Sequence, residues 1–250
     1  MNVLRTGIIA LCSLVMLHKA SAQEVNDTAK LFVEMKALQG VYKQPLSFDV
    51  RYTYASELRP GELLDSLNGH MEIAGNKYYY QLANTEMTAN EKYVITLFKE
   101  DKIMYLSKSM SQNAIDPLEQ MRVSMKTAGV NRCIVAEKGK LKTITVGFKE
   151  GGPYKELQMD FEKSSGYLLS MRYVLKTTML MESTGGANTE APAEYGEYAI
   201  VQSYYNNYKP LQSEASQFDN TKFFYKEGSE FKPTTAYNEY KIFVGSPDLQ

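Results

Sequence analysis

Few residues in this chain are of types that support catalysis or metal binding. The sequence contains two histidines and two cysteines, and residues 1–22 hold one of each. Without that segment, only His70 and Cys133 remain. A single histidine excludes a multi-histidine metal site and leaves little room for Ser-His or Cys-His catalysis. We therefore expect His70 to be a strand residue and Cys133 to be a small buried hydrophobic residue.

Acidic residues are plentiful, but none forms a recognisable catalytic pair. Glu194 and Glu197 lie close together in the sequence, and Asp49 alternates with Arg51 in a strand-like run. A glycosidase requires two carboxylates at a defined separation, which a sequence alone does not show. Phosphate loops, zinc-ligand spacings and nucleophile elbows are absent. We therefore expect no enzymatic activity and no cofactor, and a hydrolase with an unrecognised acidic site is the remote alternative.

The first 22 residues have the features of a secretory signal peptide. Arg5 gives a positive start, Gly7–Leu17 is apolar, and Ala20–Ala22 is a small-residue cleavage signal. The apolar run is too short to predict a membrane span. A lipoprotein signal would instead require cleavage before Cys12, but the apolar run continues beyond that residue. The sequence therefore predicts export.

The remaining residues, 23–250, predict a single domain. The formal net charge of the whole chain is −1, and the only charged residues in 1–22 are basic, so the rest is slightly more acidic. Such a charge gives no general attraction to nucleic acid or to an anionic membrane surface. No later segment is apolar over a length that spans a bilayer. Tyrosine and phenylalanine are abundant and tryptophan is absent, which favours strands.

Alternating apolar and polar residues predict many short strands joined by tight turns. The clearest run is 46–54, in which Leu46, Phe48 and Val50 alternate with polar residues. Helical spacing predicts an N-terminal helix over 26–40 and a second helix within 111–127. The fold class is therefore α+β, with a strongly curved antiparallel sheet. We expect the further strands at 67–74, 77–84, 93–99, 103–107, 132–137, 141–148, 154–161, 167–176, 197–208, 222–225 and 237–244.

Three stretches resemble a known family. "LSFDVRYTY", "NGHMEIAGNKYYYQL" and "KEDKIMYLSK" are similar to successive strands of the periplasmic lipoprotein-carrier superfamily, the LolA/LolB and RseB-like fold. The resemblance implies an unclosed barrel whose concave side is covered by helices. It also implies a place in the periplasm or on the periplasmic face of the outer membrane. The carriers' Arg-Pro pair is replaced here by Gly75-Asn76, so the resemblance implies a fold and a binding style rather than a cargo.

Aromatic and methionine side chains are the candidate lining of an apolar hollow between the sheet and its helices. In the strands at 93–99 and 103–107 both faces are largely apolar, so one face requires a cover of helix, partner or ligand. Methionine adapts to irregular apolar shapes and suits acyl chains. The candidate residues are Tyr80, Leu97, Met104, Leu106, Met121, Met125, Met159 and Met171.

The sequence thus favours a non-enzymatic envelope protein that binds a lipid or a lipoprotein acyl chain. The alternative is an interaction or structural component of an envelope assembly, whose aromatic strand faces contact protein or glycan. A second aromatic run, "SYYNNYKP" at 203–210, bears on that alternative, because Tyr204 and Tyr208 are expected on one strand face and Tyr205 on the other.

Overall fold

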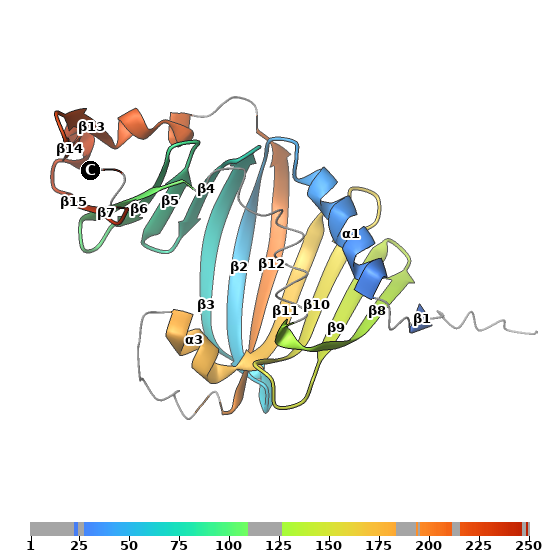
Figure 1. The fold of residues 1–250 in the computed structure, drawn as a ribbon. Helices are drawn as coiled ribbons and strands as arrows, with labels where there is room; N and C mark the ends of the chain where they lie inside the picture. The colour runs from blue at the N-terminus through green and yellow to red at the C-terminus, as the bar shows by residue number, and fades with distance from the viewer. Residues whose placement is uncertain are drawn as a thin grey trace, which may run out of the picture.

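The protein is built around one large sheet. The computed structural model describes residues 23–24, 28–109, 127–183, 194, 196–211, 216–246 and 249. In this part the strands form one 13-stranded sheet in the order β1-β8-β9-β10-β11-β12-β2-β3-β4-β5-β6-β7-β15 and one two-stranded sheet, β13-β14. The large sheet is open, with β1 and β15 at its two edges (Figure 1). The prediction of a large antiparallel sheet is confirmed.

The elements follow one another closely along the chain. The helices are α1 (Thr28–Val41) and α3 (Thr177–Ser183), with short 3-10 turns at Ser216–Phe218, Asn220–Lys222 and Thr235–Tyr237. The strands of the N-terminal half are β1 (Gln23–Glu24), β2 (Leu46–Ser56), β3 (Arg59–Ala74), β4 (Lys77–Leu82), β5 (Thr85–Ala89), β6 (Tyr93–Phe98) and β7 (Ile103–Lys108). Those of the C-terminal half are β8 (Val130–Lys138), β9 (Leu141–Phe148), β10 (Tyr154–Glu162), β11 (Leu168–Lys176), β12 (Tyr198–Pro210), β13 (Phe224–Glu227), β14 (Glu230–Pro233) and β15 (Lys241–Val244).

The hairpin of β2 and β3 is longer than the sequence predicts. The predicted strand at 67–74 begins instead at Arg59 and continues through Pro60 and Gly61, where a turn was expected. The pairing of β2 with β3 shifts register on both sides of Ala55. Such bulges leave unpaired positions in which a proline causes no loss of a ladder hydrogen bond. A local turn signal was therefore overridden by pairing with β2.

Strand β5 was not predicted from the sequence, which gave no strand at 85–89. It is joined to β4 by Ala83 and Asn84, and Ala83 adopts a left-handed backbone with φ of 47°. A two-residue turn of this kind is normally signalled by glycine or asparagine at the first position. Because alanine stands there, the turn has no sequence signature. The remaining connections of the meander, including Gly75-Asn76 with Gly75 at φ 63°, follow the prediction.

The second half of the chain forms a second run of antiparallel strands, β8 to β12. Strand β12 pairs with β11 on one side and with β2 on the other, and so joins the two halves into one sheet. The predicted strands from 132 to 208 are all found, with no bound more than two residues from the expected one. The short helix α3, which follows β11 directly, was not predicted.

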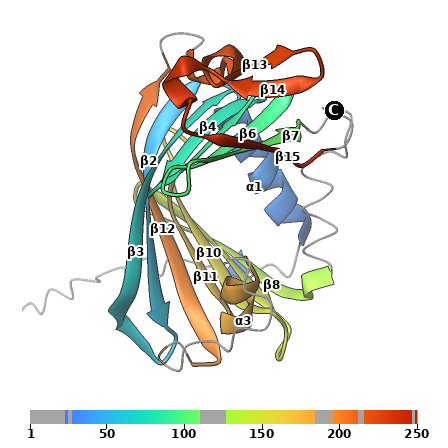
Figure 2. The same cartoon turned by 90° about the vertical axis from the view of Figure 1, so that its left-hand side faces the viewer.

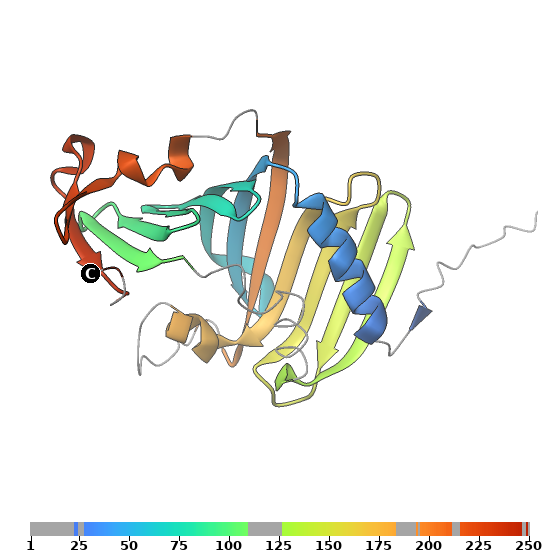
Figure 3. The ribbon, with the colours of Figure 1, turned by 45° about the horizontal axis from the view of Figure 1, so that its top comes forward.

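Figure 2 shows that the sheet is strongly bent, and that α1 lies on the inner side of the bend. We call this side the inner face and the opposite side the outer face. Helix α1 crosses the strands at the β8 end of the sheet (Figure 3). Leu31 and Met35, one helical turn apart, are buried there, whereas Val33 on the opposite side of the helix is 68% exposed. The predicted helix at 111–127 lies almost wholly outside the described residues.

Residues 216–246, which we call the C-terminal segment, return to the other end of the sheet. They form the β13-β14 hairpin and then β15, which pairs with β7 in parallel. The predicted strand at 222–225 is found as β13, two residues further along, and β14 was not predicted. The predicted strand at 237–244 is corrected to the shorter β15, which is the one parallel partner described. Asn90 fixes the start of the segment, because its amide donates to the Phe218 carbonyl oxygen at 3.0 Å.

Candidate functional site

The strand register assigns side chains to the two faces of the sheet. Directly paired residues of neighbouring strands point to the same face. Met71 pairs with Tyr80 and with Phe48, and Met171 pairs with Met159. The central strands connect these pairs, because Phe48 lies against Tyr205 at 5.9 Å between ring centroids. All of these side chains belong to the inner face, the side on which α1 lies.

The candidate lining residues divide between the two faces. Tyr80, Met159 and Met171 lie on the inner face, on β4, β10 and β11. Leu97, Met104 and Leu106 lie on the outer face. This follows because Tyr80 pairs with Met87, Met87 with Thr96 and Thr96 with Tyr105, so that the alternate residues of β6 and β7 point the other way.

The expectation of one hollow lined by all eight residues is therefore corrected. Leu97, Met104 and Leu106 are buried in a cluster with Phe223 and Phe224 of the C-terminal segment. Side chains of the protein itself fill the space above them. Met121 and Met125 lie outside the described residues. Whether the three inner-face residues bind a ligand stays a prediction.

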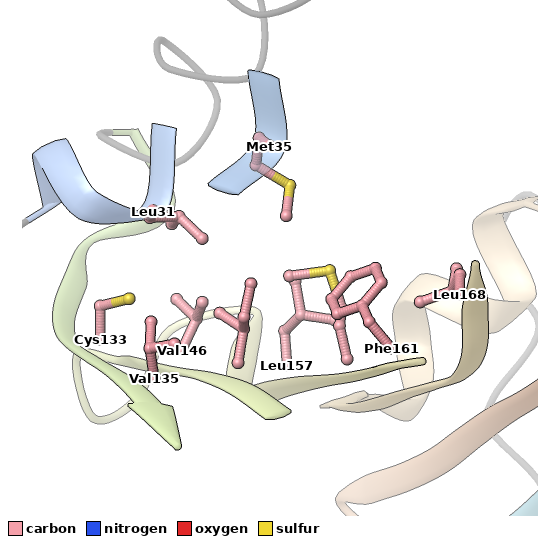
Figure 4. Packing of buried hydrophobic residues seen from close by; sticks show 10 residues of the cluster. Leu31, Met35, Cys133, Val135, Val146, Leu157, Phe161 and Leu168 are labelled. Carbon is pink, nitrogen blue, oxygen red and sulfur yellow. The ribbon is translucent and has the colours of Figure 1, made fainter. Parts of the chain in front are cut away.

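The inner face at the β8 end is a closed core beneath α1. Figure 4 shows Leu31 and Met35 of the helix above Cys133, Val146 and Leu157 of the strands. Cys133 is buried here, as expected for a small hydrophobic residue. The remaining buried members of the cluster are Val135, Ile144, Met159, Phe161 and Leu168.

An ion pair also holds the helix to the sheet. The Lys142 ammonium lies 2.8 Å from the Glu34 carboxylate, and both groups are largely shielded from solvent. A cavity of about 200 Å³ lies beside this pair, bordered by Val41, Ile144 and Phe161. The contact between α1 and the sheet is therefore apolar at its centre and charged at its margin.

The middle of the inner face carries a group of tyrosines. The hydroxyls of Tyr52 and Tyr80 interact with each other, and the Ser203 hydroxyl lies 3.0 Å from that of Tyr205. Burial raises the pKa of both Tyr173 and Tyr205 to about 12, because the charged phenolate would lose solvation. These phenols are uncharged at neutral pH. They offer hydrogen-bonding groups on a surface that is otherwise apolar.

The inner face at the β15 end presents large apolar side chains to solvent. Phe98, Tyr105 and Phe243 are 40%, 41% and 50% exposed. Tyr105 pairs with Phe243 across β7 and β15, and Phe98 pairs with Ile103 across β6 and β7, so all lie on one face. These residues were not among the candidates. The alternation along the strand predicted that Tyr105 and Leu106 lie on different faces of the sheet. It did not predict which of the two faces is covered by the rest of the protein.

The outer face at the centre of the sheet is polar and holds the single histidine described. The Nδ1 atom of His70 lies 2.7 Å from Asp49 Oδ1, and its Nε2 atom lies 3.3 Å from Glu72 Oε1. The Asn207 amide donates to Asp49 Oδ2 at 2.7 Å. Hydrogen bonds from Asn207 and His70 hold the pKa of Asp49 below its ordinary value. His70 is thus a strand residue in a local hydrogen-bond network.

The other potential catalytic groups are not brought together. Glu194 and Glu197 are exposed near the start of β12, and Cys133 lies in the core beneath α1. Among the described residues, no group of three or more His, Cys, Asp or Glu side chains is placed to hold a metal ion. Within the same residues, no helix has the length and apolar character needed to cross a membrane.

Comparison with known proteins gives distant structural neighbours. No family model and no curated protein matches the chain. An uncharacterised conserved protein from Thermus thermophilus is 10% identical, with 87% of this chain and 99% of that chain covered and a TM-score of 0.42. A LolA superfamily protein from Nitrosomonas europaea is 9% identical, with coverage of 75% and 98% and a TM-score of 0.32.

A third neighbour is a DUF1329 family protein from Desulfovibrio piger. It is 10% identical, with 79% of this chain and 99% of that chain covered and a TM-score of 0.34. A LolA superfamily protein is thus among the structures to which this chain shows a remote similarity. Because every TM-score is below 0.5, we take neither ligand nor partner from these proteins.

Proposed function

We propose that this protein is an exported carrier that binds an apolar ligand, a lipid or a lipoprotein acyl chain, on the inner face of its sheet. The observation that supports the proposal most directly is the uneven cover of that face. Helix α1 packs against the inner face at the β8 end of the sheet. At the β15 end of the same face, Phe98, Tyr105 and Phe243 are exposed. An exposed apolar surface of this kind marks a binding site or an aggregation risk.

The exposed side chains can contribute substantially to binding. Complete burial of one large apolar side chain contributes about 2 kcal/mol, and each of the three is already about half buried. An acyl chain that covers all three would gain a few kcal/mol of binding free energy from these contacts alone. Half-buried methionines extend the surface toward the centre, and their unbranched side chains adapt to a flexible ligand. They are Met71, Met87 and Met171.

The tyrosines at the centre favour an amphiphile over a pure hydrocarbon. The hydroxyls of Tyr52, Tyr80 and Tyr205 lie among apolar side chains and are uncharged. An ester or carbonyl group of a ligand would accept hydrogen bonds there at little cost in desolvation. In the proposed arrangement the ligand's tail lies against Phe98 and Tyr105, and its polar group lies near the tyrosines.

Release of the ligand would involve movement of a helix that covers the inner face. Among the side chains of α1 that the structure describes, Leu31 and Met35 are buried against the sheet and Glu34 pairs with Lys142. In this proposal residues 1–22 direct export, and residues 23–250 form one domain that acts in the periplasm or on the periplasmic face of the outer membrane.

Native mass spectrometry of the gently purified protein tests the proposal. We expect a co-purified mass that is removed by organic extraction and identified as a lipid. A protein that is empty after mild purification, and that takes up no acyl chain from mixed phospholipid vesicles, would contradict the carrier function.

A matched pair of variants locates the ligand. Phe98→Asp places a charge on the exposed inner face and should abolish lipid retention, because the carboxylate would lose solvation beneath the ligand. Tyr204→Asp is the control, since Tyr204 is equally exposed at 42% but lies on the outer face, where it pairs with Arg51. Equal retention by both variants would show that the ligand does not lie at the β15 end.

A protein interface at the β15 end is the second candidate function. In the described part, β15 is an edge strand that pairs with β7 alone, and Phe243 on it is half exposed. A free strand edge beside an apolar surface can accept a strand from another chain. An empty protein that forms a stable envelope complex, lost on Phe243→Asp substitution, would favour this function over the carrier.

A further inference from the structure

A shallow polar groove lies on the outer face, on the other side of the sheet from the proposed lipid surface. Its volume is about 490 Å³, within the range of known small-molecule sites. It crosses the central strands β12, β2, β3 and β4. The lining residues are Asp49, Val50, Arg51, Asn68, Gly69, His70, Gln81, Ala83 and Asn206.

The sheet itself places these polar side chains in one row. Asn206 pairs with Asp49, Asp49 with His70, and His70 with Gln81. Four successive strands therefore point a polar side chain to the same face at the same level. Beyond Asn206 the pairing of β12 with β2 shifts register, and Asn207 adopts a left-handed backbone with φ of 55°. This bulge turns the Asn207 amide onto Asp49.

The groove offers donors and acceptors in nearly equal number and little net charge. Its described lining contains one guanidinium, from Arg51, and one carboxylate, from Asp49. The amides of Asn68, Gln81 and Asn206 each supply both a donor and an acceptor. Planar groups of this kind can engage two neighbouring hydroxyls at once. A phosphate or an acidic peptide would require an excess of positive charge, which the groove does not have.

Beside the groove, Tyr204 presents its ring to solvent. It pairs directly with Arg51, so both side chains lie on the outer face, and the ring is 42% exposed. A tyrosine gives a flat apolar surface with a polar end, which suits contact with the C–H face of a sugar ring. Stacking next to bidentate hydrogen-bond groups is the arrangement that recognises a carbohydrate.

The groove is poorly suited to a peptide. Strands β12, β2, β3 and β4 all lie inside the sheet, so their backbone groups are paired and no strand can be added there. The Val50 side chain points to the inner face, where Val50 pairs with Tyr205, so Ala83 is the one apolar side chain that the described lining presents to the groove. The lining therefore gives no pocket for an apolar anchor.

We propose that this groove binds a neutral oligosaccharide, with Tyr204 stacking on one sugar ring and Arg51, Asn68, Gln81 and Asn206 bonding its hydroxyls. The site lies on the face opposite to the proposed lipid surface and does not depend on it. A protein with both sites would attach to a glycan of the envelope through its outer face and hold an apolar ligand on its inner face.

Isothermal titration calorimetry with the full chain tests the proposal, because it detects the binding of a sugar and of a phosphate ion alike. The probes are maltotriose, cellotriose and chitotriose, with inorganic phosphate as a charged comparison. We expect saturable binding of at least one trisaccharide and none of phosphate. An absence of binding of all three trisaccharides, or binding of phosphate alone, would overturn the proposal.

Variants at the ring assign the contact to the groove. Tyr204→Ala should weaken binding about tenfold through loss of stacking, whereas Tyr204→Phe should retain most of it. Tyr225→Ala is the matched control, because Tyr225 is 52% exposed on β13 and lies outside the groove. Equal affinity of Tyr204→Ala and the unaltered protein would overturn the proposed site. Lipid retention by Tyr204→Ala is measured in parallel, so that failure of one proposal is separable from failure of the other.

Discussion

At the β8 end of the sheet the buried side chains lie on the inner face beneath α1, whereas at the β7 end they lie on the outer face beneath the C-terminal segment. Ile144 and Val146 represent the first core, and Met104 and Leu106 the second. All four are fully buried. The alternation of each strand is the same at both ends, so the position of the covering element decides which alternate residues become core.

This difference explains where apolar surface remains exposed. Once the C-terminal segment covers Met104 and Leu106, the alternate residues Tyr105 and Phe243 must point to the inner face. At the β8 end most alternate residues on the outer face are polar, for example Thr143 and Thr145, although Ile134 also lies there. The two ends are thus not equivalent, since only the β7 end is apolar on both faces.

Shortening a buried side chain in the core beneath the C-terminal segment should have the largest effect on stability. Phe223 is 1% exposed and packs against Leu106 and its neighbours, so Phe223→Ala should lower the free energy of unfolding by about 4 kcal/mol. Urea denaturation measures this. Tyr225→Ala, two residues away and exposed, should change it by less than about 0.5 kcal/mol. Similar effects of the two substitutions would show that the C-terminal segment does not close a core.

Truncation on α1 tests the other end of the sheet. Leu31 is 0% exposed, and Leu31→Ala should lower the free energy of unfolding by about 3 kcal/mol through a cavity above Cys133. Val33→Ala is the control on the same helix, since Val33 is 68% exposed. Its effect should be close to zero. A loss below about 1 kcal/mol for Leu31→Ala would indicate that α1 is only loosely attached to the sheet.

The elements of the fold could be predicted largely from local patterns. Alternation in β2 and β4, and helical spacing in α1, depend on residues close in the sequence. The pairing of β15 with β7 joins residues more than a hundred positions apart, as in Phe243 with Tyr105, and leaves no local signature. For the same reason β15 was expected to be longer, and its parallel direction was not foreseen.

The candidate site was harder to predict than the fold. The sequence correctly placed Met104 and Leu106 on one strand face and Tyr105 on the other. Which face would be covered depended on where the C-terminal segment packs, and that segment is distant in the sequence. Tyr80 and Leu97 were therefore grouped although the register places them on opposite faces. Short-range patterns predict which residues of a strand share a face. They do not predict which face of the sheet another part of the chain covers.

The buried tyrosines of the inner face should make the protein sensitive to alkali. The pKa of Tyr173 and of Tyr205 is raised from an ordinary value of 10.0 to about 12 in the folded state. The unfolded chain therefore loses these protons at a lower pH than the folded protein. The contribution of the two tyrosines to stability is complete below pH 10.0 and is lost as pH rises toward about 12. Absorbance of tyrosinate during alkaline titration measures this.

A substitution identifies the tyrosine step. Tyr173→Phe should remove one late-titrating group and leave the steps of exposed tyrosines unchanged. In the proposed carrier, lipid on the inner face should shift the late steps further upward, since it excludes water from the phenols. Titration of all tyrosines close to pH 10.0 would contradict the burial of this group.

The outer face should show the smallest effect, and at acid pH. Hydrogen bonds from Asn207 and His70 lower the pKa of Asp49 from 3.8, so its contribution to stability is present above pH 3.8 and is lost as pH falls through the lowered folded value. Asp49 is nearly half exposed, and solvent screening limits the contribution to under about 1 kcal/mol. Urea denaturation across this range should show a shallower acid limb for Asp49→Asn than for the unaltered protein. Thr145→Ser, at a polar outer-face position with no charge, should leave the limb unchanged. An acid limb unaltered by Asp49→Asn would show that the network around His70 adds nothing to stability, unlike the two apolar cores.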